Sequence, residues 1–183
     1  KLRMNGWKVI TASTHPNRVR RLIDLLWTAW HHRNNYQVVA VEVYSDLAFR
    51  WAELLCTFLR SIKKSYILTL HGGKLPEFAQ KNSGRFRKLL LSAKAVTTPS
   101  KYLQQELLGI HEKIIYLPNG IELSVYPSCR LDAPEPNLIW LRAFHQIYNP
   151  ELAIEVLNQV VGEYPDTTLT MIGPDKGDGS LSE

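Results

Sequence analysis

The sequence predicts an α/β fold in which helices flank a parallel sheet, and three observations support this prediction. Short apolar runs alternate along the chain with longer amphipathic segments, the pattern of successive βαβ units. Most of the apolar runs end in glycine, proline or small polar residues, which are typical of turns. A hydrophobic share of 45% and a charged share of 21% in 183 residues suit a globular protein. We therefore expect a Rossmann-like parallel sheet covered on both faces, followed by the first βαβ unit of a second such domain.

The first part of the chain contains the clearest periodic segments. Asn17–Arg33 is predicted to be a helix because its apolar residues recur at i, i+3 and i+4. Ser45 or Asp46 is a suitable cap for the next helix, and Ser100 for a later one. The expected strands are Trp7–Ala12, Gln37–Val43, Tyr66–Leu70, Ala95–Thr98 and Lys113–Leu117. The other expected helices are Leu47–Lys63, Ser83–Ser92 and a segment from Ser100 to about Leu108.

The composition changes after this region. Pro127, Pro134 and Pro136 fall in a stretch with little periodicity, which indicates a linker. We interpret residues 1–124 as a first Rossmann-like domain, residues 125–136 as the linker, and residues 137–183 as the start of a second domain. In that domain we expect strands at Leu138–Leu141 and Thr168–Ile172, with a helix between them that is capped by Asn149 and has Pro150 in its first turn.

Charge and cysteine content exclude several classes of function. The net charge of +5 suits a phosphate-bearing substrate or an anionic membrane surface. Basic residues interleaved with aromatic ones, as in RNA-reading motifs, are absent, so we expect no nucleic-acid partner. Cys56 and Cys129 are far apart and show no metal-ligand spacing, so we expect no metal site and a reducing, cytoplasmic location. The apolar runs are too short to predict a transmembrane helix.

The first candidate site follows the strand Tyr66–Leu70. In parallel sheets, ligands bind beyond the carboxyl ends of the strands, which is where His71 lies. A histidine there can transfer a proton near neutral pH, and Gly72 and Gly73 let backbone N–H groups approach a ligand. A simple strand-ending turn with a surface histidine explains these residues about equally well.

Further candidate residues follow other strands. Arg142 ends the first strand of the second domain, where its planar guanidinium could bind a diphosphate, although a surface salt bridge is the more common role. Asn119 and Gly120 belong to a Pro-Asn-Gly turn that could line an interdomain cleft or be purely structural. Gly173 follows the next strand and would leave room for a phosphate, which is a weak signal by itself.

Taken in order, four segments make the chain resemble the family 4 type of GT-B glycosyltransferases. The segments are Thr69–Phe78 (TLHGGKLPEF), Ala93–Leu107 (AKAVTTPSKYLQQEL), Lys113–Leu123 (KIIYLPNGIEL) and Leu138–Gly173, the βαβ segment. The resemblance extends from about Trp7 to the end of the sequence. The order and spacing of the four segments make the resemblance specific, because each segment alone is a weak match.

The resemblance implies a retaining transfer of a sugar from a nucleotide-diphosphate donor to a glycan, a lipid-linked acceptor or another acceptor, without a further cofactor. It also implies that residues 1–124 form the acceptor-side domain and that residues 137–183 begin the nucleotide-sugar-binding domain. His71 matches the histidine beside the reacting sugar, and Arg142 matches the arginine that neutralises the leaving diphosphate. Gly173 matches a glycine near the nucleotide, and Asn119 and Gly120 match the turn at the edge of the cleft. Gly72 and Gly73 belong to the same loop as His71.

The sequence also departs from the family pattern. The lysine that often follows the arginine is absent, because the stretch here reads Ile147-Tyr148-Asn149. The glycine-rich first loop and the glutamate-containing donor loop of the family are also not found, so we expect a piece of a longer enzyme that is inactive alone. A non-catalytic module with a degenerate GT-B architecture and a nucleotide-sugar epimerase on the same fold are the alternatives.

Peripheral membrane contact is a separate hypothesis. The helix Asn17–Arg33 carries arginines beside Trp27 and Trp30, as basic amphipathic helices on anionic lipid do. A second basic group comprises Lys81, Arg85, Arg87 and Lys88. The more common arrangement in α/β proteins, which we favour from the sequence, is that the apolar side of such a helix packs on the sheet.

Overall fold

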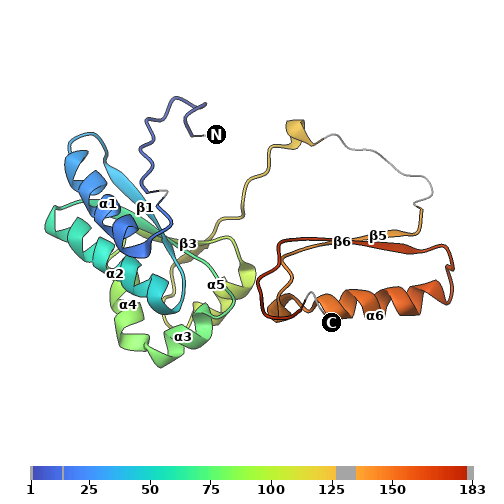
Figure 1. The fold of residues 1–183 in the computed structure, drawn as a ribbon. Helices are drawn as coiled ribbons and strands as arrows, with labels where there is room; N and C mark the ends of the chain where they lie inside the picture. Colours follow the sequence, from blue (N-terminus) through green and yellow to red (C-terminus); the bar gives the residue numbers. More distant parts are fainter. Residues whose placement is uncertain (1, 14, 127–134, 181–183) are drawn as a thin grey trace. The chain divides into compact units, whose positions relative to one another are not determined.

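The computed structural model describes residues 2–13, 15–126 and 135–180. The chain divides between Ile121 and Glu122 into two compact units, which are described separately (Figure 1). The first unit contains a parallel four-stranded sheet in the order β1-β2-β3-β4. Its strands are β1 (Val38–Val43), β2 (Ser65–Leu70), β3 (Ala95–Thr98) and β4 (Ile114–Tyr116). The predicted α/β class with a parallel sheet flanked by helices is confirmed.

Five helices accompany this sheet among the described residues of the first unit. They are α1 (Arg18–His31), α2 (Asp46–Ser61), α3 (Leu75–Lys81), α4 (Ser83–Leu91) and α5 (Lys101–Leu107). Consecutive strands are neighbours, so right-handed crossovers place the connecting helices on one face. Burial agrees, since Val41 and Leu68 are register partners on the buried face, whereas Val38 and Ile115 on the other face are about half exposed. In the described residues, the expectation that both faces are covered is therefore not met.

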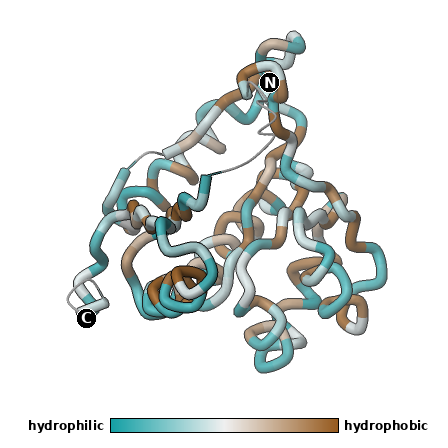
Figure 2. The backbone as a smooth tube through the Cα atoms, turned by 90° about the vertical axis from the view of Figure 1, so that its right-hand side faces the viewer, coloured by the Kyte–Doolittle hydropathy of each residue, from teal (hydrophilic) through white to brown (hydrophobic). Residues whose placement is uncertain are grey.

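The hydrophobic core lies between this sheet face and the helices. Three aromatic rings form its centre: Phe49 of α2 lies 5.0 Å from Phe78 and 5.7 Å from Phe86 between ring centroids. Phe49 and Phe86 are fully buried, as are Leu68 and Leu70 of β2. Figure 2 shows hydrophobic and hydrophilic residues alternating along the helices, as expected for elements with one buried side.

Several local predictions differ from the structure. Trp7–Ala12 forms no strand, because a strand needs a hydrogen-bonded neighbour and these residues join no described ladder. Residues 117–120 form no turn. Helix α3 was not predicted from the sequence; it is short, and Pro76 lies in its first turn.

The predicted caps have mixed outcomes. Ser100 caps α5 as predicted, because its hydroxyl accepts a hydrogen bond from the Leu103 N–H at 3.3 Å. Ser45 occupies the N-cap position of α2, but its hydroxyl donates to the Asp46 carboxylate at 2.9 Å and makes no capping bond. Capping by a side chain thus depends on its rotamer as well as on its position.

The second unit contains a two-stranded parallel sheet. Strand β5 (Asn137–Leu141) and strand β6 (Thr168–Ile172) pair in register and are connected by α6 (Pro150–Val161). The prediction that the Asn149 side chain caps α6 is wrong. Asn149 lies at the N-cap position with a left-handed backbone, φ of 48°, and its side chain makes no capping hydrogen bond. Short 3-10 helices occur at η1 (Leu123–Val125) and η2 (Gln146–Tyr148). Within the predicted linker, residues 127–134, which include Pro127, Cys129 and Pro134, lie outside the described residues.

Candidate functional site

His71 lies directly beyond the carboxyl end of β2. Its backbone N–H donates to the Val43 carbonyl at 2.9 Å, so the ladder between β1 and β2 continues to the first site residue. The imidazole ring stacks on Tyr44, with a centroid separation of 5.2 Å and an interplanar angle of 18°. The predicted histidine is thus held, half-buried, against an aromatic ring at the edge of the sheet where α/β folds bind ligands.

The two glycines after His71 have different structural roles. Gly72 has φ of +92°, a region that other residues rarely adopt, and its carbonyl accepts from the Leu75 N–H at the start of α3 at 3.0 Å. At Gly73 an added Cβ would meet no described atom within 4 Å. The turn therefore requires Gly72, whereas Gly73 leaves open space beside its exposed backbone.

Tyr44 is a site residue that the sequence analysis missed. Its hydroxyl lies 3.5 Å from Glu42 Oε2, to which it can donate a hydrogen bond. Burial and, to a lesser extent, the Glu42 charge raise the pKa of the Tyr44 phenol, so the hydroxyl stays protonated at neutral pH. The only sequence signal was its place just after a β-branched strand, at the same end of the sheet as His71.

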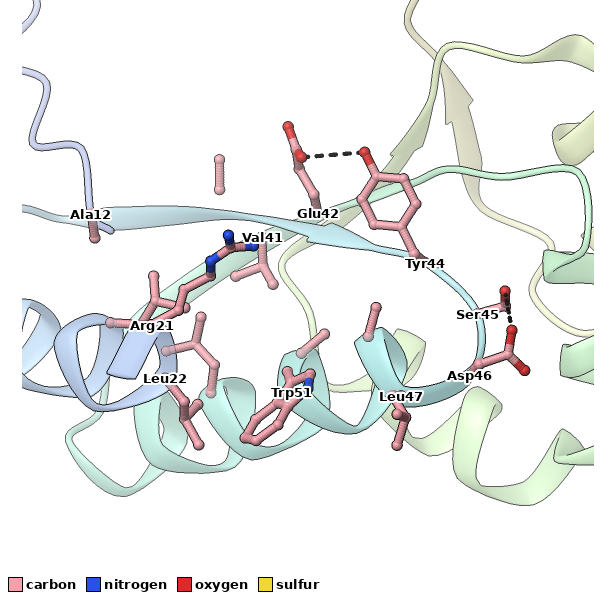
Figure 3. Close-up of a pocket in the computed structure, with 15 residues that line it drawn as sticks. Ala12, Arg21, Leu22, Val41, Glu42, Tyr44, Ser45, Asp46, Leu47 and Trp51 are labelled. Carbon is pink, nitrogen blue, oxygen red and sulfur yellow. Dashed lines mark hydrogen bonds between the residues drawn. The ribbon is translucent and has the colours of Figure 1, made fainter. Parts of the chain in front are cut away.

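A cavity of about 720 Å³ lies along β1, α1 and α2 (Figure 3). Tyr44 is among the residues that line this cavity, but Figure 3 shows its ring on the opposite side of β1 from Leu22 and Trp51. The ring that stacks on His71 therefore points away from the helices that form the cavity. Apolar side chains of α1 and α2, such as Leu22 and Leu55, line much of it, together with Arg21 and Glu42. The cavity was not predicted, because it depends on how three separate elements pack.

One polar atom close to this cavity has no hydrogen-bond partner among the described residues. The Nε1 atom of Trp51, whose side chain lines the cavity, is buried and unpaired. An unsatisfied buried N–H group is unfavourable, and this atom is itself shielded from solvent. The polar groups that line the cavity include those of Arg21 and Asp46. The cavity thus combines apolar surface with a few polar groups, as small-molecule sites commonly do.

Asn119 and Gly120 lie beyond the carboxyl end of β4. The Leu117 N–H donates to the Thr98 carbonyl at 2.8 Å, which extends the pairing of β3 and β4 by one residue. Both candidates are exposed in the irregular segment that follows. Within the described residues, no hydrogen bond or ring contact joins them to His71, so the structure does not place them in one site with it.

In the second unit, Arg142 and Gly173 lie side by side where β5 and β6 end. The Arg142 N–H donates to the Ile172 carbonyl at 3.1 Å. A Cβ atom added to Gly173 would overlap the Arg142 carbonyl oxygen and lie 2.6 Å from its carbonyl carbon. Gly173 is therefore required because the two backbones approach each other closely at this point. Its position after a strand in the sequence did not indicate this structural role.

The guanidinium of Arg142 is available to an anion. It lies 5.5 Å from the centroid of the Tyr148 ring, and the residue is exposed. Among the described residues, Arg142 forms no ion pair with a carboxylate. A planar cation resting on an aromatic ring, with its hydrogen-bond donors free, is well suited to bind phosphate oxygens.

Asp178 connects the two loops of this site. Its carboxylate accepts hydrogen bonds from the Gln146 N–H at 2.7 Å and from the Ser180 hydroxyl at 2.8 Å. These bonds, with a smaller effect of His145 at 3.4 Å, lower the pKa of Asp178 to about 2. The ionised aspartate thus fixes the start of η2, which carries Tyr148 and therefore the ring beneath Arg142.

Within the described residues, no group of three or more His, Cys, Asp or Glu side chains is placed to hold a metal ion. Over the same residues, every helix is too short or too polar to cross a bilayer.

No protein-family model matches the sequence. No curated protein matches it either.

Proposed function

We propose that the chain is part of a GT-B glycosyltransferase, similar to family 4, that transfers a sugar from a nucleotide-diphosphate donor to a glycan, lipid-linked or other acceptor. The observation that carries the proposal is the exposed Arg142 guanidinium, unpaired within the described residues, at the carboxyl ends of β5 and β6. Anionic ligands of α/β folds bind at this end of the strands. The fold class, the ordered sequence segments and the position of His71 support the same proposal.

In this proposal Arg142 binds the diphosphate of the donor. The bond between the anomeric carbon and the diphosphate oxygen breaks, and a new bond forms from that carbon to an acceptor hydroxyl oxygen. The hydroxyl proton passes to the departing diphosphate or to water. Negative charge grows on the leaving group during the reaction, so a fixed cation beside it stabilises the transition state more than the ground state.

His71 is assigned to the reacting sugar or the acceptor hydroxyl. Its stacking on Tyr44 limits rotation of the imidazole, so that one ring nitrogen can hold a hydrogen bond in a fixed direction. The adjacent cavity offers apolar walls to an acceptor.

Nucleotide binding tests the role of Arg142. Calorimetry with UDP, GDP and ADP should show binding of at least one diphosphate by this chain. Arg142→Ala should weaken it about ten-fold or more, because a charge-assisted hydrogen bond contributes about 1.5–3 kcal/mol. Arg87→Ala is the matched control, since Arg87 is an exposed arginine of α4 and should leave affinity unchanged. Equal affinities for the two variants would refute the assignment.

Turnover separates this proposal from the second candidate, a GT-B module that binds nucleotide without catalysis. That candidate is favoured by Tyr148, which stands in the stretch where the resemblance leads us to expect a lysine. Release of nucleotide diphosphate from a nucleotide sugar, slowed by His71→Ala, would support the enzyme. Because we expect this chain to be inactive alone, turnover is measured in the longer protein of which it is a piece. Binding without any turnover by that longer protein would support the module, and isomerised donor without acceptor would indicate an epimerase.

A further inference from the structure

The outer side of α1 is an unusual feature of the first unit. Four large apolar side chains on one side of this helix, Val19, Ile23, Trp27 and Trp30, are between 50% and 61% exposed. Their spacing of four, four and three residues places them in one stripe. Ala29 is buried and Leu26 packs against the core, so α1 contacts the core through a different side of the helix. The sequence-based expectation that the apolar side of this helix packs inward therefore does not hold for these four side chains, whereas Leu26 of the same predicted stripe does pack against the core.

The stripe continues onto α2. Trp30 lies 6.5 Å from Phe58 between ring centroids, and Phe58 packs against the core. Leu54, one turn before Phe58 on α2, is 53% exposed. The two helices thus form one apolar face, which we define as Val19, Ile23, Trp27, Trp30 and Leu54. Exposed apolar surfaces of this kind mark sites of protein or membrane contact.

Basic residues and an imidazole ring border this face. The Arg33 guanidinium lies 4.2 Å from the centroid of the Trp30 ring, and the His31 ring stacks on Trp27 at 4.7 Å. Arg20 is exposed next to Val19 along the helix. In residues 1–35 the sequence has seven lysines and arginines and a single acidic residue, Asp24. An apolar protein partner would not require this excess of positive charge, whereas an anionic lipid surface would.

We propose that this apolar face of α1 and α2 docks on an anionic membrane surface. Val19, Ile23 and the tryptophan rings enter the boundary between headgroups and acyl chains, and Arg20 and Arg33 bind lipid phosphates. Tryptophan is suited to this boundary because its ring is apolar and its N–H is polar. The inference is independent of the proposed glycosyl transfer, since it uses neither His71 nor Arg142.

Co-sedimentation with vesicles tests the docking face. The protein should bind vesicles of phosphatidylglycerol mixed with phosphatidylcholine, bind phosphatidylcholine alone much more weakly, and dissociate as salt rises. Arg20→Gln should weaken binding about five-fold, and Ile23→Ser with Trp27→Ser about ten-fold or more. These side chains are exposed, so the variants should fold, which circular dichroism checks.

The matched control replaces Leu152 and Ile154 by serine. Both are about half exposed on α6, beside the acidic Glu151 and Glu155, so their loss should not change vesicle binding. Equal binding to anionic and neutral vesicles would overturn the proposal, as would an unchanged affinity of the Ile23 and Trp27 variant. Self-association in sedimentation velocity without lipid, lost in that same variant, would assign the face to a second copy of the chain and also overturn it.

Discussion

Gly173→Ala is the substitution with the sharpest structural consequence. The added methyl group would occupy the position of the Arg142 carbonyl oxygen, so the ends of β5 and β6 must separate. Three backbone hydrogen bonds hold these ends together: Arg142 to Ile172 at 3.1 Å, Phe144 to Pro174 at 2.9 Å and Lys176 to Phe144 at 3.2 Å. At about 1 kcal/mol each, their loss costs the closed conformation about 3 kcal/mol.

Hydrogen exchange measures this change locally. In Gly173→Ala, protection of the Arg142 and Phe144 amides should fall about 100-fold, whereas the amides of β1 to β4 provide an internal reference. Nucleotide affinity should fall too if Arg142 binds the diphosphate. The two effects are separable, because Arg142→Ala removes the cation while leaving the backbone ladder in place.

Gly162→Ala is the matched control in the same unit. An added Cβ there would lie 3.4 Å from the Gln159 carbonyl oxygen, and φ of −60° suits any residue. It should be neutral or stabilise by about 0.4–1 kcal/mol. Wild-type protection of the Arg142 and Phe144 amides in Gly173→Ala would show that the strand ends do not meet as the structure describes.

Two further predictions concern packing and charge. Phe49→Ala removes a fully buried ring that contacts two other aromatic rings, so the free energy of unfolding should fall by about 3–5 kcal/mol in denaturant titrations, whereas Leu91→Ala, at an exposed position of α4, should change little. The pKa of Asp178 is about 2 in the fold against an ordinary 3.8, so its stabilising effect is complete above pH 3.8 and is lost as the pH falls toward 2. The Gln146 amide should lose protection over that range, and Asp178→Asn should abolish the pH dependence; a wild-type profile in the variant would contradict this role.

Most helices and strands were predictable because their signals are local. The spacing of apolar residues in α1 and α2, and the β-branched run of β1, lie within single segments of sequence. The cap at Ser100 is local in the same sense. The positions of His71 and Arg142 beyond strand ends followed from these assignments, since a residue that follows a parallel strand lies at the edge where ligands bind.

The environment of those site residues was decided by tertiary structure. The stacking of His71 on Tyr44 joins residues that follow different strands, and the cavity beside them depends on three elements. Asp178 holds Gln146 across 32 residues of chain, which no spacing rule anticipates. Asn119 and Gly120, in contrast, are placed in an exposed segment without a described contact to His71.

The sequence alone determined the alternation of strands and helices, and with it the parallel α/β class, because periodicity and caps act over a few neighbouring residues. Only the tertiary structure decided that Trp7–Ala12 pairs with no described strand, that the stripe of α1 is exposed, and that Gly173 lies against the Arg142 carbonyl. Each of these depends on contacts between segments distant in sequence. The physical reason is that strand pairing, burial and close backbone approach require a partner surface, whose position only the folded chain specifies.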